Sequence, residues 1–165
     1  MVTRSLCTFD IAGQRFGLET ARIQEVVRVD RLTAVPRARD DVAGLLNLRG
    51  LIVLAVDASL RLDLAPATTP TGSDDASSDP VTTGRNNRPV AVVLSSPEGT
   101  MALLVDEVHE ILQVDESLFI PSQDRDGSPV ARLVRGAYRT HGELTMELDV
   151  DRVLVSGADP GSDAS

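Results

Sequence analysis

The chain has 165 residues, of which 42% are hydrophobic and 25% charged, so it can form one globular unit or two small linked subdomains and its composition is not that of a disordered protein. Its formal net charge of -9 argues against nucleic-acid binding, which needs clustered positive charge. The longest apolar run, at residues 51–56, is too short for the roughly 20 residues of a membrane-spanning helix, and the amino terminus lacks a long apolar signal segment. We therefore expect a soluble, cytoplasmic protein with no direct membrane insertion.

Cysteine and histidine are too few to indicate a metal or redox centre. Cys7 is the single cysteine, and in its strand-like run a buried, unreactive thiol is favoured over a reactive one. The two histidines, His109 and His141, have neither a cysteine partner nor the H-E-x-x-H spacing of zinc proteases. The sequence predicts no metal and no cofactor.

Two hairpins are predicted in the first half of the chain. Residues 6–11 and 15–19 alternate on either side of Ala-Gly-Gln and predict the first one. Residues 21–26 combine a helical spacing of apolar side chains with a β-branched pair, which leaves a helical turn or a bent strand open, and we expect a short helix followed by a strand.

The second hairpin, at residues 45–48 and 51–56, is almost entirely aliphatic, with Arg49 and Gly50 at its turn. A row of Leu, Ile and Val left in water would promote aggregation. We therefore expect this hairpin to be buried on both faces or covered by another element.

Polar segments interrupt and end the strand-rich sequence. Residues 65–88 are rich in Pro, Thr, Ser, Asp and Gly and predict a flexible loop, and residues 156–165 predict a disordered tail. Further strands or short turns are expected at residues 90–94, 101–105, 108–114, 118–120, 133–134, 138–140 and 144–148.

An internal repeat relates the two halves of the chain. An offset of 85 carries Phe16 to Met101, Glu25 to Glu110 and Val26 to Ile111, and a later offset of 92 carries Gly44 to Gly136, Gly50 to Gly142, Val56 to Leu148 and Asp57 to Asp149. Two long copies of strand-rich sequence predict two similar β subdomains rather than a solenoid of short repeats. Each copy has about five short strands, the pattern of a small closed barrel.

The predicted fold is therefore all-β, with a few short helices: two tandem five-stranded barrels in one domain of residues 1–155. The first barrel is expected at residues 12–64 and the second at 89–155, with the loop of 65–88 between them. A barrel of about 65 residues buries too little apolar surface to be stable alone. We expect the pair to share a core or to exchange a strand, for which residues 5–11 are available.

The two copies differ at their second hairpins. The first copy has LIVLAV where the second has ELTMEL, so we expect the first hairpin to be the more deeply buried and the second to be partly solvated. Glu147, within the second copy, needs either an exposed face or a partner.

The order of several motifs resembles the CheW family of chemotaxis coupling proteins. Phe16, Leu18 and Glu25 are followed by V-P, then by G-L-L-N-L-R-G-x-I-V-x-x-V-D from Gly44, and later by L-L-V-D-E-V-x-E-I-L from Leu103. The N-L-R-G segment with its flanks is the most specific part, and the resemblance extends from about residue 6 to 154. Two departures are visible: the family often has proline at the position of Leu54 and leucine at that of Ala58, and the loop at residues 65–88 is longer than usual.

The resemblance implies a non-enzymatic adaptor of two SH3-like barrels related by a pseudo-twofold axis. Such proteins couple the cytoplasmic tips of methyl-accepting chemoreceptors to the regulatory domain of the histidine kinase CheA, and are recruited to membrane-associated chemoreceptor arrays. One alternative is a coupling protein of a non-flagellar chemosensory system, for twitching or gliding motility. A remoter one is an enzyme or small-ligand binder on the same fold.

The candidate catalytic carboxylates give the enzyme alternative little support. Asp57, Asp149 and the pair Asp106 and Glu107 have no nucleophile, phosphate loop or metal cluster beside them in sequence. Aspartates that end strands and accept backbone N–H bonds are the ordinary explanation.

The residues expected to bind partners follow from the resemblance and are Ile23, Glu25, Val26, Gly44, Arg49, Gly50 and Ile111. Arg49 is either a solvated turn residue or a receptor and kinase contact, as in similar proteins, and arginine is enriched at interface hot spots. Periodicity alone favours Ile23 and Val26 as a core-facing pair beside a solvated Glu25, whereas the resemblance places all three in a groove for a helical receptor tip. Ile111 belongs either to the kinase face or to the second core, and the core is favoured.

Overall fold

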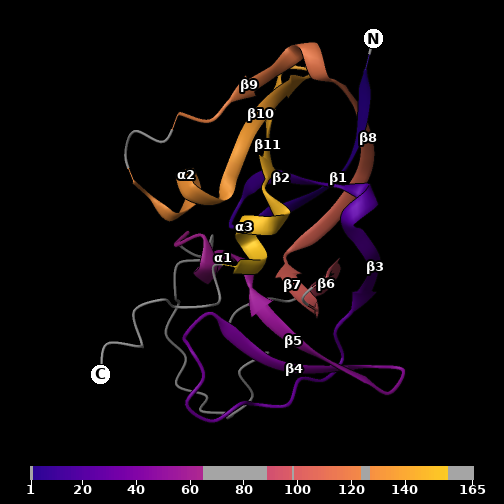
Figure 1. Ribbon diagram of the computed structural model, residues 1–165, viewed down its shortest axis with the longest axis vertical. Coiled ribbons are helices and arrows are strands. Elements are labelled where there is room, and N and C mark those ends of the chain that lie inside the picture. The colour runs from indigo at the N-terminus through magenta and orange to yellow at the C-terminus, as the bar shows by residue number, and fades with distance from the viewer. Residues whose placement is uncertain (1, 65–88, 98, 124–126, 156–165) are drawn as a thin grey trace.

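The computed structural model describes residues 2–64, 89–97, 99–123 and 127–155, which form two β-sheets and a few short helices (Figure 1). The elements in chain order are β1 (Thr3–Ile11), β2 (Gln14–Glu19), the 3-10 helix η1 (Thr20–Arg22), β3 (Ile23–Arg28), β4 (Val42–Leu48), β5 (Leu51–Asp57), α1 (Ala58–Arg61), β6 (Val90–Ser96), β7 (Gly99–Val105), β8 (Glu107–Asp115), the 3-10 helix η2 (Glu116–Leu118), β9 (Phe119–Pro121), α2 (Pro129–Leu133), β10 (Val134–Thr140), β11 (Glu143–Leu148) and α3 (Val150–Val155). The expected loop at 65–88 and tail at 156–165 lie outside the described residues. No helix in the described part of the chain is long and apolar enough to cross a bilayer.

The two sheets repeat one strand order, which confirms the all-β fold and the internal repeat. The six-stranded sheet has the order β8-β1-β2-β11-β10-β9, and the five-stranded sheet has the order β3-β6-β7-β5-β4. The sequence offsets convert the first five strands of one into the five strands of the other. The parallel pairs agree in register as well, because Met146 lies opposite Phe16 and Leu54 lies opposite Met101.

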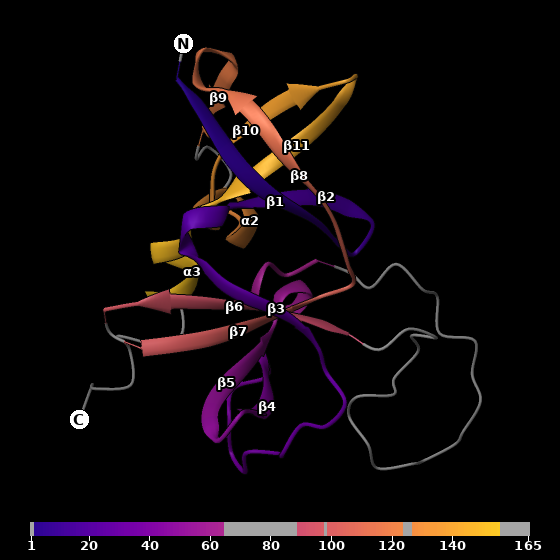
Figure 2. The ribbon, with the colours of Figure 1, turned by 90° about the vertical axis from the view of Figure 1, so that its right-hand side faces the viewer.

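Each sheet contains strands from both halves of the chain, so the expected barrel boundaries do not coincide with the sheets. The hairpin β1–β2 lies in the six-stranded sheet with β8 to β11, and the hairpin β6–β7 lies in the five-stranded sheet with β3 to β5. Figure 2 shows the two sheets one above the other. A whole hairpin is therefore exchanged, rather than one strand. It contacts the strands of the other half through a central parallel pair such as β2 and β11, which joins strands that are distant in the chain.

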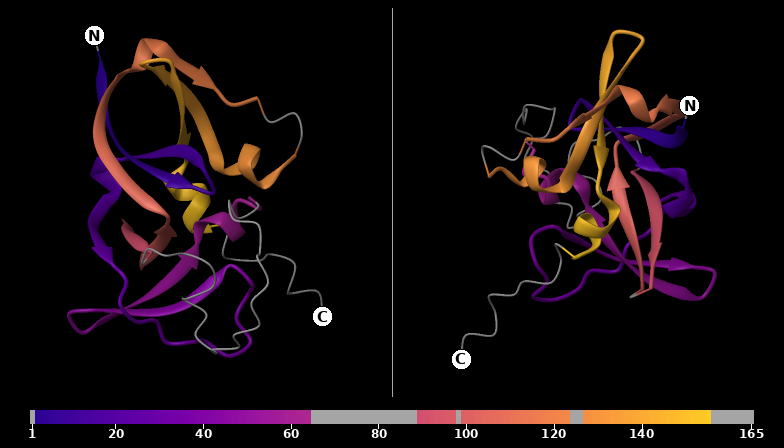
Figure 3. Two further views of the ribbon diagram at one scale, coloured as in Figure 1. Left: turned by 180° about the vertical axis from the view of Figure 1, so that it is seen from behind. Right: turned by 45° about the horizontal axis from the view of Figure 1, so that its top comes forward.

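The largest core is shared by the two sheets, as expected for small subdomains. Its buried side chains include Phe9 and Phe16 of one sheet and Leu94 and Leu103 of the other. Helices α1 and α3 lie between the sheets (Figures 1 and 3) and add apolar side chains to this core. Cys7 is also buried, which raises the pKa of its thiol and confirms the expected unreactive environment.

The predicted turns are confirmed, and a short helix precedes β3, but it is the 3-10 helix Thr20–Arg22 and residues 23–26 belong to the strand. Arg49 and Gly50 have φ of 53° and 91°, and His141 and Gly142, at the matching position, have φ of 50° and 83°. Two successive residues with positive φ form the tight turn that suits the twist of a hairpin, and glycine favours its second position. The two copies therefore make the same turn with different side chains.

The expectation that the first hairpin is fully covered is wrong. Leu51, Ile52 and Leu54 on β5 are 52%, 56% and 39% exposed, whereas Val53 and Ala55, on either side of Leu54, are buried. One face of the strand packs on the small core of the five-stranded sheet and the other faces solvent. Because the strand is aliphatic on both faces, its sequence does not distinguish the two. The second hairpin is not the more solvated one, because Glu147 is only 2% exposed and has ion-pair partners.

Candidate functional site

Arg49, at the tip of the β4–β5 hairpin, forms an ion pair with Glu25 on β3. Arg49 Nη2 lies 3.2 Å from Glu25 Oε2, and the two side chains are 87% and 24% exposed. Strands β3 and β4 are the two edges of the five-stranded sheet, so this ion pair joins elements that backbone hydrogen bonds do not connect. The structure thus brings together two residues that the sequence nominated separately.

The backbone of the turn holds Arg49 in an outward position. Asn47 Oδ1 accepts a hydrogen bond from the backbone N–H of Gly50 at 2.8 Å. A side chain at Gly50 would meet open space, so glycine is needed for its positive φ and not for a close contact. The N-L-R-G sequence therefore presents one cation at a fixed place on the rim of the sheet.

A groove lies between the edges β3 and β4, next to this ion pair. Apolar side chains of Val27, Leu45, Leu46 and Leu48 line it, together with the polar residues Arg28, Asp30, Arg31, Thr33 and Asn47. Val27 and Leu48 also pack against the small core of the five-stranded sheet. An apolar lining with a charged rim is suited to an amphipathic segment of another protein.

Ile23 and Val26 lie in different environments along β3. Ile23 is half-buried and packs against the shared core, while Val26 is 41% exposed. The interpretation of the two as a core-facing pair is therefore wrong for Val26. Glu25 and Val27 alternate with Val26 along the strand, so Val26 lies on the opposite face of β3 from the ion pair.

Ile111, the repeat mate of Val26, is on the surface of the six-stranded sheet. It lies opposite Cys7 in the β1–β8 pair and is 61% exposed. Its favoured assignment to the second core is wrong. Because it belongs to the other sheet, it does not join the group around Arg49.

Gly44 is buried and has a role in the fold. A Cβ atom there would lie 2.6 Å from the carbonyl oxygen of Thr33, which exchanges backbone hydrogen bonds with Leu45. The repeat mate Gly136 has the same restriction, since its Cβ would lie 2.5 Å from the carbonyl oxygen of Ile120. Both glycines let a preceding segment cross the hairpin closely, and Gly44 has no exposed surface for a partner.

Sequence reasoning missed the exposed side chains Leu51, Ile52 and Leu54, which adjoin the turn of Arg49. The run of aliphatic residues on β5 concealed which ones face outward. The repeat gives no signal either, because the mate of Ile52 is Leu144, another aliphatic residue, which is 49% exposed at the start of β11.

The strand-ending aspartates cap helices, as expected. Asp57 Oδ1 accepts hydrogen bonds from the backbone N–H groups of Ser59 and Leu60 at the start of α1, and Asp149 accepts one from Arg152 in α3. Asp106 accepts one from the backbone of Ala12. These carboxylates have structural partners.

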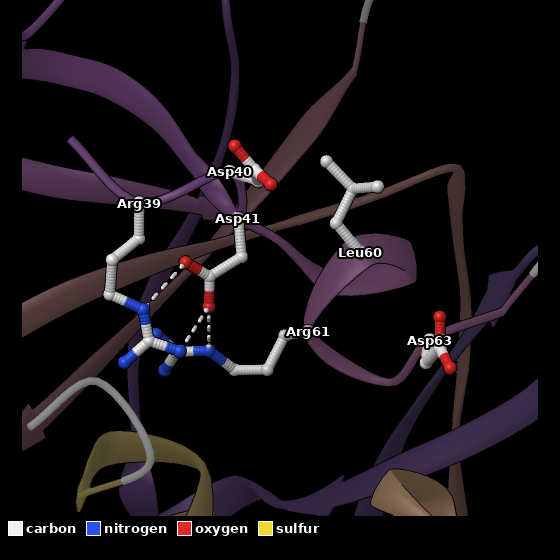
Figure 4. A pocket seen from close by; sticks show the side chains of 6 residues that line it. All are labelled: Arg39, Asp40, Asp41, Leu60, Arg61 and Asp63. Atoms are coloured by element: carbon white, nitrogen blue, oxygen red, sulfur yellow. Dashed lines mark hydrogen bonds and ion pairs between the residues drawn. The ribbon is translucent and has the colours of Figure 1, made fainter. Parts of the chain in front are cut away.

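A polar pocket near α1 contains charges that already pair with one another (Figure 4). The buried Arg61 donates from Nε to Asp41 Oδ2 at 3.0 Å and from Nη1 to the carbonyl oxygen of Val153 in α3. Arg39 adds a second, weaker ion pair to Asp41. We interpret this cluster as a link between β4, α1 and α3.

The chain is similar to known proteins over most of its length. Residues 5–158 match the family model described as the CheW-like domain. The chain belongs to the CheW family. It is 27% identical over 153 residues to the chemotaxis protein CheW of Rhizobium meliloti, covering 93% of this chain and 88% of that protein. Over 147 residues it is 23% identical to the chemotaxis protein CheW of Thermotoga maritima, covering 89% and 85%.

A solved CheW structure has the same fold. The scaffolding protein TtCheW from Thermoanaerobacter tengcongensis superposes with a TM-score of 0.71 at 21% sequence identity, covering 91% of this chain and 86% of that one. Membership of the CheW family makes the chain a chemotaxis scaffold protein. The ion pair of Arg49 and Glu25, the groove and the outer faces of the two sheets are thus candidate contact surfaces of a CheW-family scaffold.

Proposed function

We propose that this protein is a non-enzymatic adaptor that couples the cytoplasmic tips of methyl-accepting chemoreceptors to the histidine kinase CheA in signalling arrays. The observation that carries the proposal is the ion pair of Arg49 with Glu25, which spans two sheet edges beside a groove with apolar and polar lining residues. A receptor tip is helical, and an amphipathic helix binds such a groove through apolar anchors and a polar rim.

The kinase is assigned to the other sheet. Ile111, Ile120 and Leu144 are 61%, 48% and 49% exposed on strands of the six-stranded sheet, and Leu118, in the 3-10 helix η2 between β8 and β9, is 59% exposed. Exposed aliphatic residues outside the core support a protein contact. A receptor on the five-stranded sheet and a kinase domain on the six-stranded sheet can then be bound at the same time, which a coupling protein requires.

An adaptor needs no chemistry of its own, and the carboxylates support this. Asp57, Asp149 and Asp106 accept backbone hydrogen bonds. Within the described residues, the pocket of Figure 4 contains no hydroxyl or thiol nucleophile beside a base. The same adaptor function serves a non-flagellar chemosensory circuit if the receptor and kinase belong to one.

The test is a titration of the isotope-labelled protein with a receptor-tip fragment and with a CheA regulatory domain, followed by amide NMR. The receptor fragment is expected to shift signals of β3 and the Arg49 turn, and the kinase domain those of β8 and β11. Adding the second partner to the first complex should produce both sets together. Competition for one common set of signals would contradict the two-surface proposal.

A further inference from the structure

Three potential metal ligands meet on the strand pair β1 and β8. They are Asp10, Glu107 and His109, and one ligand atom from each lies within 4.8 Å of the other two. His109 Nε2 is 2.8 Å from Asp10 Oδ2. Asp10 and His109 are half-buried and Glu107 is exposed, so the group is accessible from solvent.

The strand register explains how residues so distant in sequence meet. Asp10 lies directly opposite Glu107, and His109 is two positions further along β8. A β-bulge between Cys7 and Phe9 shifts the register next to His109. The hydroxyl of Thr8 donates to the carbonyl oxygen of Glu110 at 2.7 Å and fixes the bulge. Bulges commonly redirect a side chain at functional positions.

The charges in this group favour a bound cation. Two like charges directly opposite each other on neighbouring strands destabilise a sheet, and Asp10 and Glu107 are such a pair. Arg15 Nε compensates one side, at 2.8 Å from Asp10 Oδ1. Glu107 forms no ion pair with any described residue.

The fold itself does not require these side chains. In the other copy of the repeat, the offset of 85 places Ser95, Arg22 and Gln24 where Asp10, Glu107 and His109 stand here. The matching strand pair, β6 with β3, forms without any of the three ligands. The group is therefore a feature of one copy.

We propose that Asp10, Glu107 and His109 bind a divalent transition-metal ion, for which Zn²⁺ is the representative ion. One imidazole nitrogen, two carboxylates and water complete the four positions that zinc prefers. Neighbouring ligand atoms of a tetrahedral zinc are about 3.3 Å apart, so Asp10 Oδ2 and His109 Nε2 separate slightly to admit the ion. Because a nitrogen that binds a metal ion carries no proton, the imidazole of the ion-bound form would have its proton on Nδ1.

Arg15 is the residue that orients the site. Its bond to Asp10 Oδ1 leaves Oδ2 directed at His109, as outer partners of metal-binding carboxylates do. The ion would join β8, an edge strand, to β1. The proposed ion site lies in the six-stranded sheet, whereas the groove between β3 and β4 lies in the five-stranded sheet.

Calorimetric titration of the untagged full chain with zinc chloride tests the proposal. We expect one ion per chain and a higher unfolding temperature, because a ligand of the native state stabilises it. His109→Ala should abolish this binding and Glu107→Gln should weaken it at least tenfold. His141→Ala is the matched control, since this second histidine lies on an exposed turn and should leave the affinity unchanged.

Two further measurements separate binding from folding. The imidazole nitrogen signals of His109, and not those of His141, should shift on addition of zinc. Glu107→Gln alters only an exposed charge, so its weaker binding supports the site even if His109→Ala unfolds. Zinc bound equally by wild type and both of these variants, or lost only in His141→Ala, would overturn the proposal. Stronger binding of magnesium than of zinc would also overturn it, because magnesium prefers oxygen ligands.

Discussion

The guanidinium of Arg4, on the first strand, lies 2.9 Å from the carboxylate of Glu147 on β11. Glu147 is 2% exposed, and Arg135 reaches it from β10 at 3.5 Å. Arg4 also pairs with Glu19 at 3.0 Å. These ion pairs connect β1 to β11 across β2, which lies between them in the sheet. In the other sheet, the repeat mate of Glu147 is the small, uncharged Ala55.

Replacing Arg4 by Met is expected to lower the free energy of unfolding by about 2–3 kcal/mol, because it leaves the buried carboxylate of Glu147 with the more distant Arg135 as its remaining partner. Urea denaturation measures the change. The double variant Arg4→Met with Glu147→Gln should recover much of the loss. A double variant as unstable as Arg4→Met alone would show that packing of the Arg4 side chain, rather than charge, determines the effect.

The pH dependence of stability should distinguish wild type from Glu147→Gln. Burial raises the pKa of Glu147 above its ordinary value despite Arg4 and Arg135. The folded state therefore keeps this proton at a pH where the unfolded state has lost it, and wild type loses stability relative to the variant as pH rises through this window. Denaturation at several pH values from 4 upward, an ordinary range for a carboxyl group, measures the difference. A constant difference would contradict the raised pKa.

Arg49→Ala should weaken binding to a receptor-tip fragment at least tenfold, while the free energy of unfolding changes by less than about 0.5 kcal/mol because the side chain is largely exposed. Titration calorimetry and urea denaturation measure the two effects. His141→Ala changes the matching turn of the other copy and should bind the receptor normally. Equal losses in the two variants would mean that the turn conformation matters more than the arginine.

Gly50 is less informative than Arg49 as a test of binding. Its φ of 91° makes any side chain there strained, at a cost of about 1 kcal/mol. Binding lost in Gly50→Trp would mix an effect on the fold with an effect on the surface.

Gly44→Ala and Gly136→Ala should each lower the free energy of unfolding by about 2–4 kcal/mol, because the new methyl group would collide with a backbone carbonyl oxygen. Gly13→Ala is the control: it has a positive φ of 81° but open space around it, so the expected cost is about 1 kcal/mol. Denaturation curves for the three variants test this order. Gly44 also has a positive φ, so equal effects of Gly44→Ala and Gly13→Ala would indicate that φ alone, and not the crossing segment, demands glycine at residue 44.

Ile52→Ser should change the free energy of unfolding by less than about 0.5 kcal/mol, because this side chain is 56% exposed. Its neighbour Val53 is fully buried, and Val53→Ala should cost about 1–3 kcal/mol. Thermal or urea unfolding separates the two. A large loss for Ile52→Ser would mean that β5 is covered as its sequence suggests.

The repeat predicted more of the fold than any single motif did. Matching Phe16 with Met101 and Val56 with Leu148 anticipated the common strand order, since equivalent residues occupy equivalent ladders. The repeat did not predict the exchange of whole hairpins. It shows which residues of the two copies are equivalent, but not whether a strand pairs with its own copy or with the other one. Similarly, the aliphatic run on β5 has no alternation from which an exposed face can be recognised.

The sequence identified residues of the candidate site but did not predict how they lie relative to one another. Arg49 and Glu25 were both nominated, yet their pairing depends on the two sheet edges approaching each other. The meeting of Asp10 with His109 depends on the register of β1 against β8, which the sequence does not fix. Gly44 was nominated as part of a motif, whereas the crossing of Thr33 over its strand explains its presence.

The exchange of hairpins also limits how the chain can acquire its structure during synthesis. Met146, the strand partner of Phe16, is synthesised only after β3 to β10. The apolar face of the β1–β2 hairpin therefore stays exposed until β10 and β11 have been synthesised. Apolar surface that is exposed in a partly folded chain promotes aggregation. Neither sheet can be completed from one half alone, so the two halves must reach the native state together.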